Sequence, residues 1–318
     1  MSEEVIYLAG GCFWGLEHLM HSLKGVNDAI SGYANGTGAD DANYKTVCTG
    51  QTGFHETVKV TYDRETISLK AILGAYFYVI DPTTSNRQGH DLGTQYQTGI
   101  YYVDEDSRKI VEEVVAIEKA RYSKFCVEVQ ELVNFYPAEE YHQRYLDKNP
   151  DGYCHIPRAA IAMFKDVKID PGQYERPNET EIKNMLSVES YNVTQNKGTE
   201  MPFANAFYNN HAKGIYVDIV TGEPLFASSD QFDSGCGWPA FSKPIEAPVV
   251  VELEDVSHGI VRTEVRSSVG NSHLGHVFEN DPTSPNGIRY CINSAALKFI
   301  PLEEMDEQGY GNLKVYVK

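Results

Sequence analysis

A short polar segment divides this chain into two stretches whose hydrophobic patterns differ. Residues 165–177, KDVKIDPGQYERP, combine charged side chains with two prolines and a glycine and show no apolar periodicity, which is typical of a linker. The chain has 318 residues, roughly twice the usual length of one domain. We therefore expect two domains, residues 1–164 and residues 178–318, on either side of this linker.

The first stretch alternates strand and helix signals, which favours an α/β or α+β fold. An apolar run at residues 5–9 predicts a buried strand, and apolar residues then recur with helical spacing until Gly25. Residues 57–63 alternate like a half-buried strand, and Ser68 can begin the helix that follows. We expect a two-layer sandwich in which helices pack on a mixed sheet.

Three more elements are expected before the linker. Apolar spacing predicts a helix through residues 110–117. Pro137 suits the first turn of a helix that reaches about Leu146, because the missing N–H of proline is not needed there. Residues 159–163 have the composition of a strand.

The second stretch begins with one short helix, near residues 179–186, and continues with short strands between turn signals. These strands are expected at residues 215–220, 249–253, 260–265, 288–292 and 313–317. A run of this kind predicts a mainly antiparallel β domain made of two packed sheets.

The charge of the chain excludes several classes of partner. Lys and Arg number 27 against 45 Asp and Glu, a net charge of −18, which would repel phosphate backbones and anionic lipid. Nucleic acid and membranes are therefore not expected as partners. The start of the chain, MSEEVIYLAGG, has acids where a secretory signal has basic residues, and its apolar run is too short for a membrane span. We predict a cytoplasmic protein.

The cysteines point to thiol chemistry rather than to a structural metal. The six cysteines are Cys12, Cys48, Cys126, Cys154, Cys236 and Cys291, and no CxxC pair occurs, so the usual sign of a zinc ribbon or a thioredoxin-type dithiol is missing. In a reducing compartment, a disulfide among them is expected to be transient and catalytic. We expect no cofactor and no bound metal.

Cys12, in the string GGCFWG, is expected at the N-terminus of the first helix. Unpaired N–H groups and the helix dipole favour a thiolate at such a position. Phe13 and Trp14 offer aromatic surface for a small apolar group. A buried structural cysteine in a tight strand-to-helix turn is the alternative.

The string GCFWG resembles the signature of the A-type methionine sulfoxide reductase family, and the likeness covers most of the first stretch. Further matching strings are SGYANG at 31–36, GFHETVKVTYD at 53–63, GHDLGTQYQTGIY at 89–101 and PAEEYHQRYL at 137–146. The resemblance implies that Cys12 attacks the sulfoxide sulfur while Glu56 gives a proton to the oxygen. A protonated carboxyl in an apolar pocket suits that role, although an acid beside a strand is more often solvated.

The same resemblance assigns the remaining residues of this site. Tyr44 and Tyr96 would hydrogen-bond the sulfoxide oxygen, with Asp91 nearby, and Phe13 and Trp14 would hold the S-methyl group.

The resemblance also implies a second thiol, because the sulfenic acid formed at Cys12 condenses readily with one. Cys154, in the loop NPDGYCHI, is the expected resolving cysteine. Cys48 and Cys126 are weaker candidates, and Cys126 is expected to begin a strand and to be buried.

The second stretch resembles the B-type methionine sulfoxide reductase family. The matching strings are YNVTQNKGTEMPF, GIYVDIVTGEPLFASSDQFDSGCGWPAF, SHLGHVFEN and RYCINSAALKFIP. The resemblance implies that Cys291 is the nucleophile, and Arg289 and Asn293 alternate with it on one strand face. An arginine at this distance would favour the thiolate.

The other implied roles in this stretch fall on four residues. His273 and His276 would bind and protonate the sulfoxide oxygen, Trp238 would pack on the methyl group, and Cys236 would resolve the sulfenic acid. The His-x-x-His pair could instead join both cysteines in a zinc site. Many relatives carry a separate zinc on two CxxC pairs; this chain has neither, so we expect packing alone to hold the β domain.

Together the two resemblances predict a bifunctional enzyme that repairs oxidised methionine, one enzyme type for each sulfoxide epimer. The first domain would reduce the S-sulfoxide and the second the R-sulfoxide, free or protein-bound, and a thioredoxin-like reductant would regenerate both. The alternatives are a metal-binding or redox-sensing module without turnover, and a thiol peroxidase.

Overall fold

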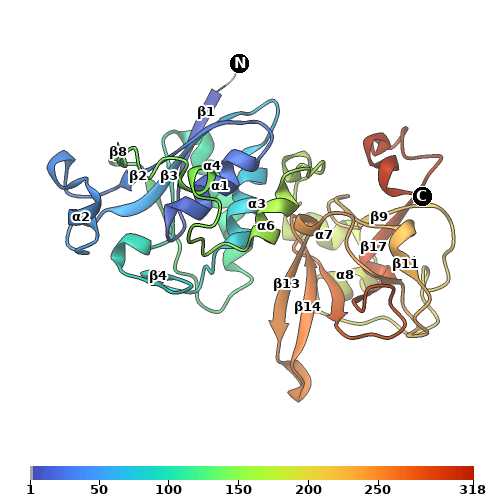
Figure 1. Ribbon diagram of the computed structural model, residues 1–318. Helices are drawn as coiled ribbons and strands as arrows, with labels where there is room; N and C mark the ends of the chain where they lie inside the picture. The colour runs from blue at the N-terminus through green and yellow to red at the C-terminus, as the bar shows by residue number, and fades with distance from the viewer. Residues whose placement is uncertain (1–2) are drawn as a thin grey trace. The chain divides into compact units, whose positions relative to one another are not determined.

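The computed structural model describes residues 3–318 and consists of two compact units, one that ends at Gly172 and one that spans Gln173–Lys318 (Figure 1). The division lies inside the segment 165–177, and each side of it is anchored to its own unit. The carboxylate of Asp170 accepts a 3.0 Å hydrogen bond from the Ser68 backbone N–H, and Arg176 donates to the carbonyl of Gly270. The segment therefore has contacts that a flexible linker lacks.

A six-stranded sheet forms the centre of the first unit. Its strands lie in the order β7 (Glu128–Glu131), β6 (Gly99–Tyr102), β1 (Glu3–Ala9), β3 (His55–Asp63), β2 (Val26–Ala34) and β8 (Phe135–Pro137). All neighbours are antiparallel except β6 and β7, which are parallel. A helix, α4 (Glu105–Lys119), lies between these two strands in the chain, as parallel pairing requires a crossover. The predicted mixed sheet is confirmed.

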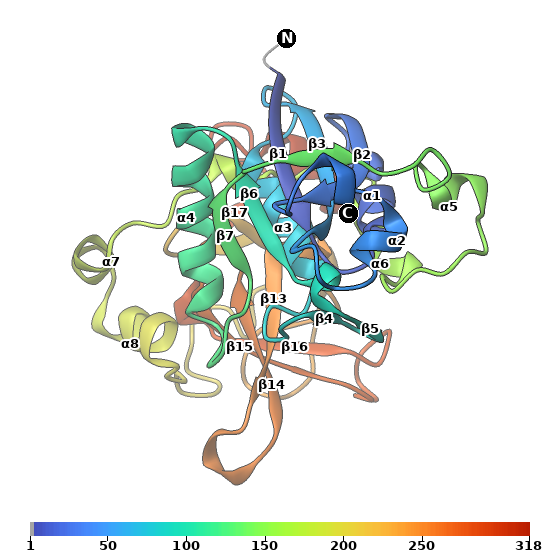
Figure 2. The same ribbon diagram turned by 90° about the vertical axis from the view of Figure 1, so that its left-hand side faces the viewer.

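The long helices of this unit share one apolar core with the sheet. Figure 2 shows α1 (Phe13–Ser22), α3 (Leu69–Val79) and α4 beside the strands. Ile6 and Leu8 of β1 belong to the same buried cluster as residues of all three helices. At the start of α3 the Ser68 hydroxyl accepts a hydrogen bond from Ala71 N–H, which makes Ser68 the expected N-cap. Other short elements of this unit include α2 (Tyr44–Val47), β4 (Arg87–Gln88) and β5 (Asp91–Leu92).

Two predicted elements of the first unit are wrong. Pro137 ends strand β8, pairs with Gly32, and begins no helix. Because β8 is an edge strand, the missing N–H of proline costs it no ladder bond on the open side. Only a short helix, α5 (Tyr145–Lys148), follows. Residues 158–164 form helix α6 (Arg158–Phe164) instead of a strand, because Ile161 and Phe164, three residues apart, are both buried.

The second unit begins with two helices, α7 (Glu179–Met185) and α8 (Val188–Asn196), of which only the first was predicted. Two antiparallel sheets follow. The smaller has the order β10 (Pro224–Ala227), β9 (Gly214–Asp218), β17 (Leu297–Pro301). The larger has the order β11 (Gln231–Phe232), β12 (Ala240–Phe241), β16 (Arg289–Ile292), β15 (His273–Phe278), β14 (Arg262–Ser267), β13 (Val250–Asp255).

The two sheets pack through aromatic side chains, which confirms the predicted β architecture. Phe241 of β12 stacks on Phe226 of β10 with ring centroids 4.4 Å apart and meets Tyr216 of β9 edge-on at 5.1 Å. The strand predicted at 313–317 is wrong: residues Gly311–Tyr316 form a 3₁₀ helix. Leu313 is buried there while Val315 is 59% exposed, so these two residues do not share the buried face that a strand would give them.

Packing alone does not hold the sheets of this unit together. Two buried carboxylates near the ends of β9 and β10 bind the turn between β14 and β15. Asp218 accepts hydrogen bonds from the hydroxyls of Ser267 and Ser272. Glu223 accepts from the backbone N–H groups of Val269 and Gly270 at 2.8–3.1 Å. The expectation of packing alone is therefore incomplete, because these polar links satisfy buried backbone groups.

No helix within residues 3–318 is both long enough and apolar enough to cross a membrane.

Candidate active sites

A pocket of about 230 Å³ lies at the N-terminus of α1 in the first unit. Its lining consists of Cys12, Phe13, Trp14, Tyr44, Glu56, Asp91, Tyr96 and Tyr153. The structure thus brings together residues from five separate parts of the chain, and of these residues only Tyr153 was not singled out from the sequence.

Cys12 is the N-cap of α1, as predicted, and only 7% of it is exposed. Burial raises the pKa of its thiol well above the usual range, and the charge of Glu56 adds to this effect, while a hydrogen bond from the Trp14 backbone N–H acts in the opposite direction. The helix N-terminus therefore does not outweigh burial. The resting group is therefore the thiol, in contrast to the expected thiolate.

Glu56, on β3, is 98% shielded from solvent and accepts a 3.1 Å hydrogen bond from the Phe13 backbone N–H. Burial raises the pKa of this carboxyl to about 8; the Phe13 N–H lowers it and the charge of Asp91 raises it further. Most Glu56 side chains are therefore protonated at neutral pH, which is the state that a general acid needs.

Three tyrosines complete the polar side of the pocket. Tyr44 begins α2, and its backbone N–H donates to Glu139 at 2.9 Å. Burial, and then nearby charges, raise the pKa of Tyr44 and of Tyr96, so both hydroxyls remain hydrogen-bond donors. The Tyr153 hydroxyl donates to both oxygens of Asp91 at 3.1 Å, and burial followed by this contact raises the pKa of Tyr153 to about 12.

A buried histidine that the sequence analysis did not single out holds the aromatic side. The Trp14 indole N–H donates to Nδ1 of His142 at 3.2 Å, and the His142 ring lies 5.2 Å from the ring of Phe13 and 4.7 Å from that of Tyr44. Trp14 also stacks on Tyr145 at 3.8 Å. The orientation of Trp14 is therefore fixed from two sides.

Cys154 lies against the first turn of α1. A Cβ atom placed on Gly15, which lies three residues after Cys12, would come within 2.9 Å of the Cys154 sulfur. The absence of a side chain at Gly15 therefore leaves room for the Cys154 thiol. Cys154 is half-buried, and its thiol donates to the Ile156 carbonyl at 3.1 Å. Cys126 precedes β7, is only half-buried, and donates to the Thr83 carbonyl at 3.3 Å, so the prediction that it begins the strand and is buried is wrong.

The second unit places two cysteines side by side. The sulfurs of Cys236 and Cys291 lie 3.5 Å apart, and both cysteines are free. The hydrogen bond between these sulfurs lowers the pKa of Cys236 and raises that of Cys291, and the charge of Arg289 favours a thiolate on either sulfur. The pair therefore carries one negative charge more readily than a lone thiol does.

A row of cross-strand neighbours places the histidines near Cys291. Glu264, His276 and Cys291 are direct partners across β14, β15 and β16, so their side chains share one face. His273 and His276, three residues apart, would lie on opposite faces of a regular strand. A bulge between His273 and Gly275 removes this difference, and the two rings lie 5.5 Å apart.

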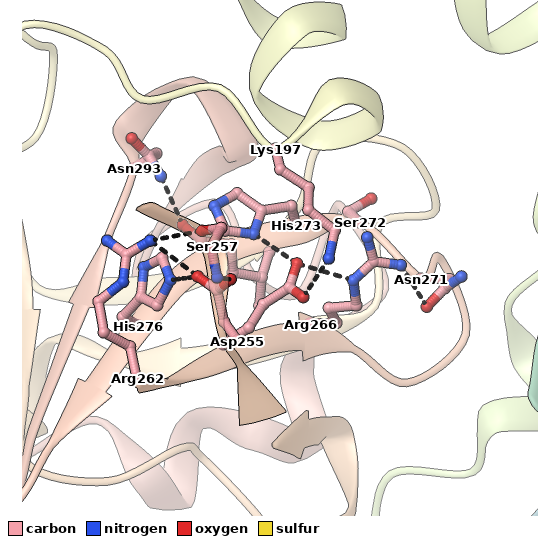
Figure 3. Close-up of polar contacts among 12 residues, drawn as sticks. Lys197, Asp255, Ser257, Arg262, Arg266, Asn271, Ser272, His273, His276 and Asn293 are labelled. Atoms are coloured by element: carbon pink, nitrogen blue, oxygen red, sulfur yellow. Dashed lines mark hydrogen bonds and ion pairs between the residues drawn. The ribbon is translucent and has the colours of Figure 1, made fainter. Parts of the chain in front are cut away.

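Each histidine is held by its own carboxylate (Figure 3). Nδ1 of His273 bonds to Glu264 at 2.7 Å, and Nε2 of His276 bonds to Asp255 at 2.8 Å. The two rings are therefore fixed through opposite nitrogens. Asp255 also accepts from Arg262 at 2.8 Å.

The remaining predicted residues lie around this pair. Arg289 donates to Asp281 and lies 4.6 Å over the Phe278 ring. Both ends of the Asn293 side-chain amide bind backbone, at Leu274 and Glu200, so Asn293 shapes the site through the chain. The Trp238 indole N–H donates to the Glu200 carbonyl at 3.2 Å. Within the described part of the chain, no group of three or more His, Cys, Asp or Glu residues is arranged to hold a metal ion.

Two family models match the chain. Residues 4–170 match peptide methionine sulfoxide reductase, and residues 186–301 match the SelR domain.

Solved structures similar to the chain correspond to about half of it. Reduced Mxr1 from Saccharomyces cerevisiae is 39% identical, with 48% of this chain and 88% of that chain covered and a TM-score of 0.46. Methionine sulfoxide reductase A of Corynebacterium diphtheriae is 32% identical, with 49% and 83% covered and a TM-score of 0.43. Mxr1 in complex with Trx2 is 26% identical, with 45% and 84% covered and a TM-score of 0.33.

Proposed function

The chain belongs to the peptide methionine sulfoxide reductase family and carries a SelR domain C-terminal to the part that matches this family, and we propose that each of its units reduces one epimer of methionine sulfoxide. The chain is an oxidoreductase of oxidised methionine. We also propose domain bounds of 1–164 and 178–318.

In the first unit, Cys12 attacks the sulfoxide sulfur and Glu56 protonates the oxygen. The observation that carries this assignment is that the buried Cys12 thiol and the Glu56 carboxyl line one pocket, with the pKa of Glu56 at about 8 because of burial. Tyr44 and Tyr96 hydrogen-bond the same oxygen, and Phe13 and Trp14 enclose the methyl group. The oxygen passes to the cysteine and Glu56 recovers the proton that the Cys12 thiol loses, so methionine and a Cys12 sulfenic acid result; sulfur of the substrate is reduced and sulfur of the enzyme is oxidised.

In the second unit, Cys291 plays the part of Cys12. A proton that crosses the 3.5 Å contact with Cys236 leaves the thiolate on Cys291, facing Arg289. His273 and His276 bind and protonate the oxygen, and Trp238 packs on the methyl group.

One pair of thiols then closes the cycle in each unit. The Cys12 sulfenic acid condenses with Cys154, and the Cys291 sulfenic acid with Cys236, releasing water and leaving a disulfide. The 3.5 Å separation of Cys236 and Cys291 exceeds a disulfide bond, about 2.0 Å, by a distance that a loop residue covers easily. A thioredoxin-like dithiol reduces each disulfide by exchange. Four such thiols function best in a reducing compartment, which supports a cytoplasmic location.

The stereochemical division follows from the separation of the sites. A sulfoxide is a chiral pyramid, so a pocket that fixes methyl, oxygen and direction of attack accepts one hand only. By the family resemblance, the first unit takes the S epimer and the second the R epimer, on free or protein-bound methionine.

The test is an assay of both separated epimers with single-cysteine variants. Cys12→Ser is expected to abolish reduction of the S epimer and to spare the R epimer, and Cys291→Ser to do the reverse. Cys126→Ser is the matched control and is expected to change neither rate. Loss of both activities in one variant, with the fold intact by circular dichroism, would contradict the two-site assignment.

A further inference from the structure

A buried carboxylate next to the second site has no part in the mechanism above. Glu264, on β14, is 1% exposed and accepts three charged or polar donors. These are Nζ of Lys197 at 2.7 Å, Nε of Arg266 at 2.9 Å and Nδ1 of His273 at 2.7 Å. Burial alone would raise the pKa of Glu264, but the hydrogen bonds from these three side chains outweigh it and lower the pKa to about 2. Glu264 is therefore an anion at every pH at which the enzyme works.

An anionic Glu264 decides which nitrogen of His273 carries the hydrogen. A carboxylate only accepts, so Nδ1 must donate and the lone pair lies on Nε2. His273 is 2% exposed, and among the described residues Nε2 has no hydrogen-bond partner. An unpartnered buried nitrogen is costly, and here it lies on the sheet face that carries Cys291.

The charges around His273 are not balanced. Glu264 and Arg266 face it from β14, and Lys197 faces Glu264 from the C-cap of α8. On the other side are His276 of the same strand, Asp255 of β13 and Arg262 of β14 (Figure 3). Glu264 with its two cations sums to one positive charge, so removing the carboxylate charge or one of the cations changes the electrostatic field at the His273 ring in opposite directions.

We propose that Glu264 is the positioning residue of the second site: it aims Nε2 of His273 at the sulfoxide oxygen, while Lys197 and Arg266 fix the Glu264 carboxylate through their hydrogen bonds. This inference rests on the proposed function of that unit. In the step, Nε2 takes the proton that the Cys291–Cys236 pair loses as Cys291 attacks, and passes it to the oxygen. Sulfoxide and thiol become sulfide and sulfenic acid, and His273 ends as it began.

The bulge in β15 makes this arrangement possible. A Cβ atom on Gly275 would lie 2.1 Å from the Cys291 carbonyl, so only glycine permits the close strand approach that turns His273 to the face of Glu264.

The first test compares two variants whose effects must have opposite sign. Glu264→Gln keeps an acceptor for Nδ1 but leaves two cations beside the ring, so the acid-side fall of kcat for the R epimer, where the ring can no longer accept a proton, is expected to move to lower pH by about one pH unit. Lys197→Met removes one cation, so the same fall is expected at higher pH. Lys243→Met is the control, because Lys243 pairs with Asp230 at 3.6 Å and is 58% exposed; its profile should match the parent.

A merely structural role predicts a different result. Each of Glu264→Gln and Lys197→Met would then lower kcat by the same factor at every pH, and the position of the fall in the pH profile would not change. Shifts of the same sign, or no shift, would overturn the proposal.

The second test does not depend on turnover. Imidazole ¹⁵N spectra of the full chain should show His273, assigned by its loss in His273→Gln, as the Nδ1–H tautomer, and Glu264→Gln should populate both tautomers. An Nε2–H ring in the parent protein would overturn the proposal even if both variants lose activity. If Cys291→Ser still reduced the R epimer, the proposed function of the unit would fail, and the spectra would still decide the tautomer.

Discussion

The protonation of Glu56 governs when the first site can work. A general acid acts only in its protonated form, and burial raises the pKa of Glu56 to about 8. Turnover of the S epimer should therefore hold from neutral pH up to about pH 8 and fall as pH rises through that value, because the carboxyl ionises.

Glu56→Gln removes the proton donor and keeps an oxygen that accepts from the Phe13 N–H. We expect kcat for the S epimer to fall by a factor of about 10² to 10⁴ and the alkaline limb at pH 8 to disappear. Rapid-mixing assays at pH 6–9 measure both effects. Glu65→Gln, an exposed acid outside the pocket, is the matched control, and an unchanged limb in Glu56→Gln would assign the proton to another group.

The resolving thiols act after the chemistry on methionine is complete. Cys154→Ser and Cys236→Ser should each keep one turnover at the affected site, about one methionine per site, and lose sustained turnover with thioredoxin, because no protein disulfide can form. Dithiothreitol reaches the sulfenic acid directly and should sustain turnover.

A rapid-quench count of methionine, beside steady-state rates with both reductants, checks this order of steps. Undiminished thioredoxin-dependent turnover of the S epimer in Cys154→Ser would transfer the resolving role to Cys48 or Cys126. Loss of the first turnover would place Cys154 in the chemical step itself.

At the scale of single residues, the sequence indicates the groups that react but not those that hold them. Cys12 and Glu56 stand in strings that resemble a family signature, so their proximity could be expected. His142 holds Trp14, and Glu264 holds His273, by hydrogen bonds that span 128 and 9 residues of chain. No periodicity encodes such a pair, because it depends on how separate elements pack.

The bulge of β15 is the element on which the second site depends. Gly275→Ala would bring a side chain within 2.1 Å of the Cys291 carbonyl, and backbone cannot yield as a flexible side chain does. We expect loss of R-epimer turnover, with unchanged S-epimer turnover. Gly287→Ala is the control, because Gly287 also has a positive φ of 81° but open space around it; an equal loss there would mean that backbone strain alone is responsible.

Element boundaries show where sequence patterns stop being informative. Helices α1, α3 and α4 follow apolar spacing and were predicted, whereas Pro137 ends an edge strand because the sheet, not the local sequence, decides its partner. Strand β15 was missed because His273, Gly275 and His276 lack strand propensity; pairing with β14 and β16 on both sides compensates for it.

The buried carboxylates of the second unit make its stability depend on pH. Burial, followed by the charge of Asp218, raises the pKa of Glu223 from 4.5 to about 7, so the folded unit binds a proton that the unfolded chain releases more readily. This contribution to the free energy of unfolding is complete below pH 4.5 and is lost as pH rises through about 7.

Glu223→Gln should remove that dependence, so that its stability relative to the parent is lower at pH 5 than at pH 8. The chain has two tryptophans, Trp14 and Trp238, one in each unit. In a Trp14→Phe background, urea unfolding followed by tryptophan fluorescence therefore reports the unfolding of the second unit alone. A parent protein that is equally stable at pH 5 and pH 8 in this assay would contradict the prediction.

At the scale of the whole molecule, each unit contains its own core and its own set of site residues. The division at Gly172 lies in a segment without apolar periodicity, and such a stretch cannot contribute much to a core. What composition did not show is that Asp170 and Arg176 anchor this segment to different units. Polar anchors leave no trace in hydrophobic patterning.

The position of these anchors decides where the chain can be divided. Fragments 1–172 and 173–318 keep the Asp170–Ser68 contact at the start of α3 and the Arg176–Gly270 contact beside the β14–β15 turn. We expect both fragments to fold and each to reduce one epimer at the rate of the full chain. The shorter fragments 1–164 and 178–318 lose those contacts and the buried side chain of Ile169, so their melting temperatures should be lower, by about 2–4 °C for each kcal/mol lost in a domain of roughly this size. Calorimetry of the four fragments, together with the two epimer assays, separates the effects. Inactive or insoluble long fragments would mean that neither unit is complete alone. Equal melting temperatures for long and short fragments would show that the Asp170 and Arg176 contacts contribute nothing to stability.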